Sequence, residues 1–154
     1  MTDTTPAIAI IGAGIAGLTA AATLRKIGLK AAIYEQAQAF KQFLLTAAPD
    51  ADQLKDLDFL LEVGHLFSLI VYGQLILEQA ALTGVDHDIV DQIFDFQVRD
   101  FSSYAVAVHG KSSSTQAQQE WALGAIRKPA ADAARFGRVW ERVKAYDGAY
   151  VMRP

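Results

Sequence analysis

Cysteine is absent from the 154 residues of the chain. Disulfide bonds, thiolate metal sites and cysteine nucleophiles are therefore excluded together. Charged residues make up only 20% of the sequence and the formal net charge is −3, so a nucleic-acid partner is not expected. Residues 1–6 lack the basic region of a signal peptide, and the apolar run at 7–11 is too short for its apolar part. These features predict a cytoplasmic protein.

Apolar residues are abundant, at 52% of the sequence, which is typical of a folded protein with an ordinary core. The charges are distributed unevenly along the chain. Residues 1–40 carry a net charge of +1, residues 41–100 carry −8 and residues 101–154 carry +4. An acidic middle and a basic end predict ion pairs within the molecule.

A glycine-rich motif lies near the start of the chain. The apolar run at 7–11 comes directly before Gly12-Ala13-Gly14-Ile15-Ala16-Gly17, which has G-x-G-x-x-G spacing. A helical stretch at 18–26 and a short apolar run at 31–34 follow, so residues 1–40 predict a strand–helix–strand (βαβ) element of the Rossmann type. In such an element Gly12 allows the tight turn, Gly14 lets a pyrophosphate approach the backbone, and Gly17 lets the helix pack on the sheet.

Glu35 follows the second predicted strand, 23 residues after Gly12. A carboxylate at this point accepts hydrogen bonds from both ribose hydroxyls and repels a 2′-phosphate, which favours FAD or NAD over NADP. The predicted cofactor-binding residues are therefore Gly12, Ala13, Gly14, Ile15, Ala16, Gly17 and Glu35. The alternative is a glycine- and alanine-rich helix and turn that binds no ligand.

The continuation Ile33-Tyr34-Glu35-Gln36-Ala37-Gln38-Ala39-Phe40 extends this pattern. Residues 7–40 resemble the start of flavoprotein aromatic-ring hydroxylases, the group of salicylate-type FAD-dependent monooxygenases. The resemblance implies an FAD-dependent oxidoreductase in which this segment binds the ADP moiety of FAD. It also implies a later Asp-Gly element and a Gly-Asp element near the flavin. Gly-Asp does not occur here, and the only Asp-Gly is Asp147-Gly148. We therefore expect the element at 1–40 to be incomplete and the chain to be inactive alone.

Residues 41–154 predict an all-α bundle of about four helices, which makes the protein mostly helical overall. The expected boundaries are Leu54 to Leu82 with a stop at Gly84, Asp86 or Asp88 to His109-Gly110, Thr115 to Lys128, and Ala130 or Asp132 to Asp147-Gly148. Thr115 and Gln118 have the spacing of a capping box. The second helix should bury one stripe, formed by Val90, Phe94, Phe101, Ala105 and Val108.

The first of these helices is predicted to be the central, buried one, because its apolar residues become dense at 66–72. Its apolar segment is shorter than the span of a bilayer, so no membrane partner is expected. The residues expected to be largely buried are Leu66, Phe67, Ile70, Phe94, Phe101, Trp121 and Trp140. So much apolar helix surface also predicts a homo-oligomer.

No metal site is predicted. The three histidines, at 65, 87 and 109, lack the i, i+4 spacing of a helical metal site. The aspartates at 86, 88, 91 and 95 have the spacing of an exposed helix face, and the glycine of a calcium-binding loop is missing.

A second resemblance covers residues 44–154. The run from Leu44-Leu45-Thr46-Ala47-Ala48-Pro49-Asp50-Ala51-Asp52 through Ile126-Arg127-Lys128-Pro129 is similar to the C-terminal helical region of bacterial acyl-CoA dehydrogenases, which also use FAD. That family's catalytic glutamate has no counterpart here, so the catalytic residues stay unknown. The two resemblances together imply a junction of two flavoenzyme pieces near Phe40. An acyl-CoA dehydrogenase-related helical fragment and a non-catalytic oligomerisation module are the alternatives to a flavoprotein oxidoreductase.

Overall fold

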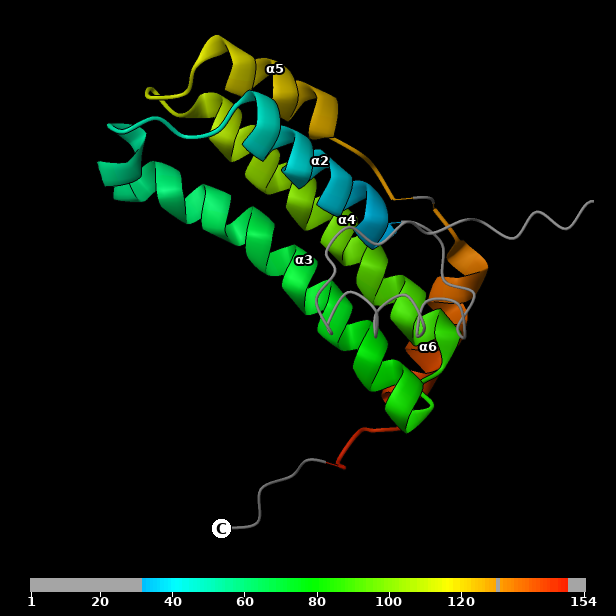
Figure 1. Ribbon diagram of the computed structural model, residues 1–154. Coiled ribbons are helices and arrows are strands. Elements are labelled where there is room, and N and C mark those ends of the chain that lie inside the picture. Colours follow the sequence, from blue (N-terminus) through cyan, green and yellow to red (C-terminus); the bar gives the residue numbers. More distant parts are fainter. Residues whose placement is uncertain (1–31, 130, 150–154) are drawn as a thin grey trace, which may run out of the picture.

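The computed structural model describes residues 32–129 and 131–149. Within these ranges the chain forms five α-helices and one 3-10 turn, and it forms no strand (Figure 1). The elements in chain order are α2 (Ala32–Thr46), η1 (Gln53–Lys55), α3 (Leu57–Thr83), α4 (His87–Gly110), α5 (Gln116–Ala125) and α6 (Ala133–Lys144). Between positions 53 and 146 the described residues are mostly helical and form no strand, as the sequence predicts.

The predicted strand at 31–34 is wrong, and with it the βαβ element. Residues 32–34 form the start of α2, which continues without a break through position 40. A run of four apolar residues does not distinguish a strand from a helix, whereas the residues that follow do. They are mostly good helix formers, and buried Phe40, Phe43 and Ala47 recur at helical spacing. The predicted first strand at 7–11, the glycine motif and the helix at 18–26 lie outside the described residues.

The central helix of the bundle is α4, because it packs against α2, α3, α5 and α6 (Figure 1). The sequence predicted this role for α3, and that prediction is wrong. The stripe predicted for α4 is confirmed, since its five members are all buried: Val90, Phe94, Phe101, Ala105 and Val108. The main core lies where this stripe meets α2 and α3, and it includes Phe43, Phe59 and Leu66.

One side of α3 is apolar and exposed. More than half of each side chain's surface is open at Leu61, Phe67, Tyr72, Leu75 and Leu82. An 18-residue window of α3 has a mean hydropathy of 1.7, and only 17% of that window is buried. By length and composition, though by nothing else, α3 is thus long and apolar enough to cross a membrane. The sequence analysis therefore underestimated the length of the apolar segment of α3.

Burial agrees with the sequence in the core and differs at two aromatic residues. Leu66, Phe94 and Phe101 are buried, whereas Ile70 and Trp121 are half-buried. Phe67 and Trp140 are 54% and 51% exposed, so the prediction that they are buried is wrong. Trp140 stacks on Phe136 of its own helix, with ring centroids 6.5 Å apart. An amphipathic pattern identifies an apolar face but does not establish that another element covers it.

Salt bridges attach α6 to α4 through three arginines. Arg135 pairs with Asp95, Arg142 pairs with Asp86, and Arg138 donates two hydrogen bonds of 2.7 and 2.9 Å to Asp88. The hydrogen bond from Arg138 lowers the pKa of Asp88. The predicted pairing of the acidic middle with the basic end is therefore confirmed. Because the arginines face α4, the aromatic residues of α6 are turned outward.

Helix ends follow local sequence signals. Gly84 ends α3 in the left-handed conformation, with φ of 68°, and Asp86 begins α4 by accepting a hydrogen bond from the backbone of Asp88. The predicted capping box of Thr115 and Gln118 is confirmed. The start of α3 differs from the prediction, because Asp56 caps it after the separate 3-10 turn η1.

Two buried glutamines connect α2, η1 and α5. The side-chain amides of Gln53 and Gln118 exchange two hydrogen bonds, each of 2.8 Å. Gln118 is fully buried and also donates to the carbonyl of Ala47 at the end of α2, at 3.1 Å. Gln53 donates in addition to the carbonyl of Ser113. The two glutamines thus donate hydrogen bonds to backbone carbonyl groups at the ends of helices and in loops.

We expect Gln118→Leu to lower the free energy of unfolding by about 1–3 kcal/mol, because it leaves buried hydrogen-bonding groups without partners. Urea denaturation followed by circular dichroism measures this loss. Gln116→Leu is the matched control, since Gln116 is exposed on the same helix. Equal stability of the two variants would contradict a structural role for the glutamine pair.

Candidate functional site

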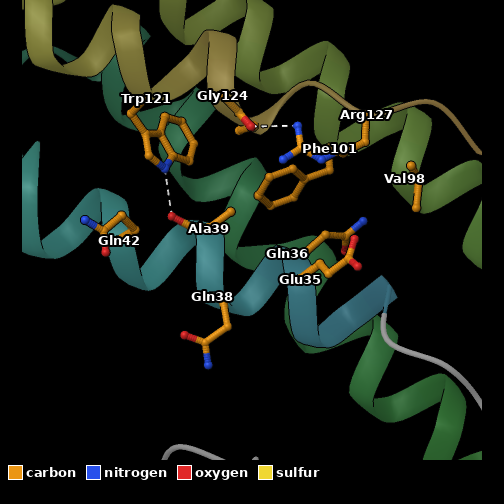
Figure 2. Close-up of a pocket in the computed structure, with 11 residues that line it drawn as sticks. Glu35, Gln36, Gln38, Ala39, Gln42, Val98, Phe101, Trp121, Gly124 and Arg127 are labelled. Carbon is orange, nitrogen blue, oxygen red and sulfur yellow. Dashed lines mark hydrogen bonds between the residues drawn. The ribbon is translucent and has the colours of Figure 1, made fainter. Parts of the chain in front are cut away.

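A cavity of about 570 Å³ lies where α2, α4 and α5 meet (Figure 2). All three helices contribute to its wall, and α4 and α5 pack closely on one another beside it. The lining residues are Glu35, Gln36, Gln38, Ala39, Gln42, Val98, Phe101, Trp121, Gly124, Ala125 and Arg127. The volume lies within the range of about 300–1,000 Å³ that is usual for small-molecule sites.

Two aromatic side chains form a firm part of the wall. Phe101 is 2% exposed, and it belongs to the core cluster that also holds Phe43. The indole nitrogen of Trp121 donates a hydrogen bond of 2.7 Å to the carbonyl of Ala39 (Figure 2). The ring of Trp121 also packs on Phe43, with centroids 4.7 Å apart. These contacts hold the indole in one orientation against α2.

Gln36 is the unusual polar residue of the cavity. Its side chain extends from α2 toward Phe101 (Figure 2), and the residue is only 6% exposed. Among residues 32–129 and 131–149, neither the oxygen nor the nitrogen of its side-chain amide has a hydrogen-bond partner. A buried group left unpaired in this way costs about 1–3 kcal/mol. Such groups are few in native structures, and a bound polar ligand or water is one explanation for them.

Opposite charges stand at two points of the cavity wall. Glu35 is exposed in the first turn of α2, where the positive end of the helix dipole favours a carboxylate. Arg127 follows the end of α5 and donates hydrogen bonds of 2.7 and 2.8 Å to the carbonyls of Gly124 and Ile126. The cavity therefore combines flat apolar walls with a carboxylate, a guanidinium and a buried amide.

The predicted site residues fall into two groups. Gly12, Ala13, Gly14, Ile15, Ala16 and Gly17 lie outside the described residues. Glu35 is described, and it projects from a helix rather than from the end of a strand. Sequence reasoning missed Gln36 and Arg127 entirely and assigned Phe101 and Trp121 to the core alone. The position of Gln36 directly after the predicted ribose-binding residue was the one available signal.

Metal binding has no structural support in the part of the chain described. Within residues 32–129 and 131–149 there is no group of three or more histidine, aspartate or glutamate side chains placed to hold an ion. His65 instead stacks on Tyr104, with ring centroids 4.6 Å apart.

Comparison with known proteins gives one match. Residues 10–40 match the model of the NAD(P)-binding Rossmann-like domain, a family of dinucleotide-binding domains. The match covers 31 of 154 residues, from position 10 to position 40, and includes the glycine motif, Glu35 and Gln36. No curated protein and no solved structure matches significantly. The chain thus carries a dinucleotide-binding motif at its N-terminal end, while the match leaves the choice between FAD and NAD open.

Proposed function

We propose that this protein binds FAD through the ADP moiety, and that it is related to flavoprotein oxidoreductases of the monooxygenase type. The observation that carries the proposal is the match of residues 10–40 to a dinucleotide-binding domain, which coincides with the G-x-G-x-x-G spacing. The described residues are compatible with such a ligand, because Glu35 is exposed beside a cavity of suitable volume.

Each residue of the proposed site has a defined role. In the segment Gly12-Ala13-Gly14-Ile15-Ala16-Gly17, Gly12 allows the tight turn, Gly14 lets the pyrophosphate approach the backbone, and Gly17 lets the helix pack closely. Glu35 accepts hydrogen bonds from the adenosine ribose and disfavours a 2′-phosphate, and so NADP. The resemblance of residues 7–40 to flavoprotein hydroxylases favours FAD over NAD. A purified protein that is yellow and has a flavin absorption spectrum is the direct test.

Replacing Glu35 by Ala should weaken FAD binding by about 1–3 kcal/mol, the usual contribution of hydrogen bonds to a charged acceptor. Titration of FAD against the purified variants, followed by flavin fluorescence, measures the change. Glu141→Ala is the control, because Glu141 is exposed on α6 and does not line the cavity. Unchanged affinity in Glu35→Ala would remove the ribose contact from the proposal.

We expect no catalytic turnover from this chain alone. No residue can be assigned to hold the isoalloxazine ring, and accurate positioning of reactants supplies about 7–11 kcal/mol of a catalysed barrier. The assay supplies FAD, NADH or NADPH, and either a phenolic acid or an acyl-CoA. Substrate-dependent NAD(P)H oxidation or flavin reduction well above that of free FAD would contradict this expectation.

The exposed apolar side of α3 favours a second candidate, a non-catalytic self-association module. Leu61, Tyr72 and Leu75 are all more than half exposed on this helix. Burying them against a second copy would remove apolar area from water. Analytical ultracentrifugation of the purified protein separates the candidates: a colourless oligomer supports this one, and a yellow monomer supports FAD binding alone.

A further inference from the structure

We infer that the cavity between α2, α4 and α5 receives the adenine base of a nucleotide, with Gln36 as the residue that recognises it. The inference rests on the proposed dinucleotide binding for the identity of the base, but its structural support is independent. The wall residues named above and the amide of Gln36 all belong to the described part of the chain.

The aromatic side chains in the cavity wall favour a flat aromatic ring as the ligand. Phe101 and Trp121 lie on different helices and both border the space (Figure 2). Nucleic-acid bases stack favourably on aromatic side chains, since every base has a π-face. The hydrogen bond from Trp121 to Ala39 fixes the indole before any ligand arrives, so little side-chain freedom is lost on binding.

Gln36 selects a ring edge that presents a hydrogen-bond donor beside an acceptor, and the adenine of the proposed dinucleotide has such an edge. A glutamine amide offers one acceptor and two donors, and it pairs in bidentate fashion with the amino group and N7 of adenine. Both polar atoms of the Gln36 amide are buried, and no described residue pairs with either of them. A bound adenine would supply a partner for each of them. A ligand edge with one donor beside one acceptor would thus pair with both the oxygen and the nitrogen of the amide.

Glu35, the residue before Gln36, lies at the same cavity. It is exposed, so a carboxylate stands beside the proposed base site. In a nucleoside the ribose is joined directly to the base. Consecutive residues of α2 would therefore contact the two joined parts of adenosine.

Tryptophan fluorescence can test the inference directly. The chain has two tryptophans, Trp121 in the cavity wall and the half-exposed Trp140 on α6. In a Trp140→Phe variant, Trp121 is the single remaining tryptophan, so the tryptophan fluorescence reports on the cavity wall. Adenosine should change its fluorescence in a saturable manner. Purine riboside, which lacks the 6-amino group, should bind about tenfold more weakly because one hydrogen bond is lost.

Gln36→Leu in the same background separates binding from folding. We expect adenosine affinity to fall by about tenfold or more, while the melting temperature does not fall, because the substitution removes an unpaired buried amide. Gln116→Leu, on the exposed side of α5, should leave adenosine binding unchanged.

The outcomes distinguish this inference from the proposed function. Loss of adenosine binding in Gln36→Leu with stability retained supports the adenine site. If FAD binds but adenosine leaves Trp121 unaffected, or if Gln36→Leu binds adenosine normally, the cavity assignment is overturned and dinucleotide binding stands. If neither FAD nor adenosine binds, both proposals are overturned.

Discussion

Phe43→Ala should lower the free energy of unfolding by about 3–5 kcal/mol, the usual loss for a fully buried phenylalanine. Phe43 has no exposed surface, and its ring stands 6.0 Å from that of Phe40 and 4.7 Å from that of Trp121, between centroids. Truncation removes contacts on both sides and leaves a cavity beneath Trp121. Because typical domains are stable by only about 5–15 kcal/mol, this single change threatens the whole fold.

Urea denaturation followed by far-UV circular dichroism measures the loss. Leu45→Ala is the matched control on the same helix, because Leu45 is 70% exposed, and its effect should stay within about 0.5 kcal/mol. A Phe43→Ala variant as stable as the control would contradict the arrangement of α2 on the core.

Gly14→Val should abolish FAD binding. In the G-x-G-x-x-G pattern the second glycine is the point at which the pyrophosphate approaches the backbone, and a branched side chain occupies the space that the phosphates need. This loss is larger than that expected for Glu35→Ala, because a steric block affects the whole ligand rather than one set of hydrogen bonds.

Flavin fluorescence titration of Gly14→Val provides the measurement, with circular dichroism to verify that the helices remain. Gly137→Val is the control, since Gly137 is exposed on α6 and, among the described residues, no atom outside the adjoining helix backbone lies within 4 Å of a Cβ added there. FAD affinity retained in Gly14→Val would remove the glycine motif from the proposed function.

Local signals in the sequence determined where several helices begin and end. Gly84 as a stop, Asp86 as an N-cap and the Thr115–Gln118 box all act within four residues, through hydrogen bonds that depend little on the rest of the fold. The buried stripe of α4 was equally readable, because helical spacing places Val90, Phe94 and Phe101 on one face.

The sequence-based error at 31–34 has a local cause as well. The dinucleotide pattern demands a strand there, but the four residues are too few to indicate one by their periodicity. Residues 32–34 instead form the first turn of α2, whose stability comes from packing Phe40 and Phe43 on the core.

Tertiary structure alone decided which apolar faces are covered and which residues share the cavity. Trp140 is exposed because the arginines of α6 face the aspartates of α4, a choice that no helical pattern contains. Gln36, Phe101 and Arg127 stand far apart in the sequence and meet only because three helices pack together. Caps and periodicity are properties of neighbouring residues, whereas burial and cavities depend on partners that local sequence does not specify.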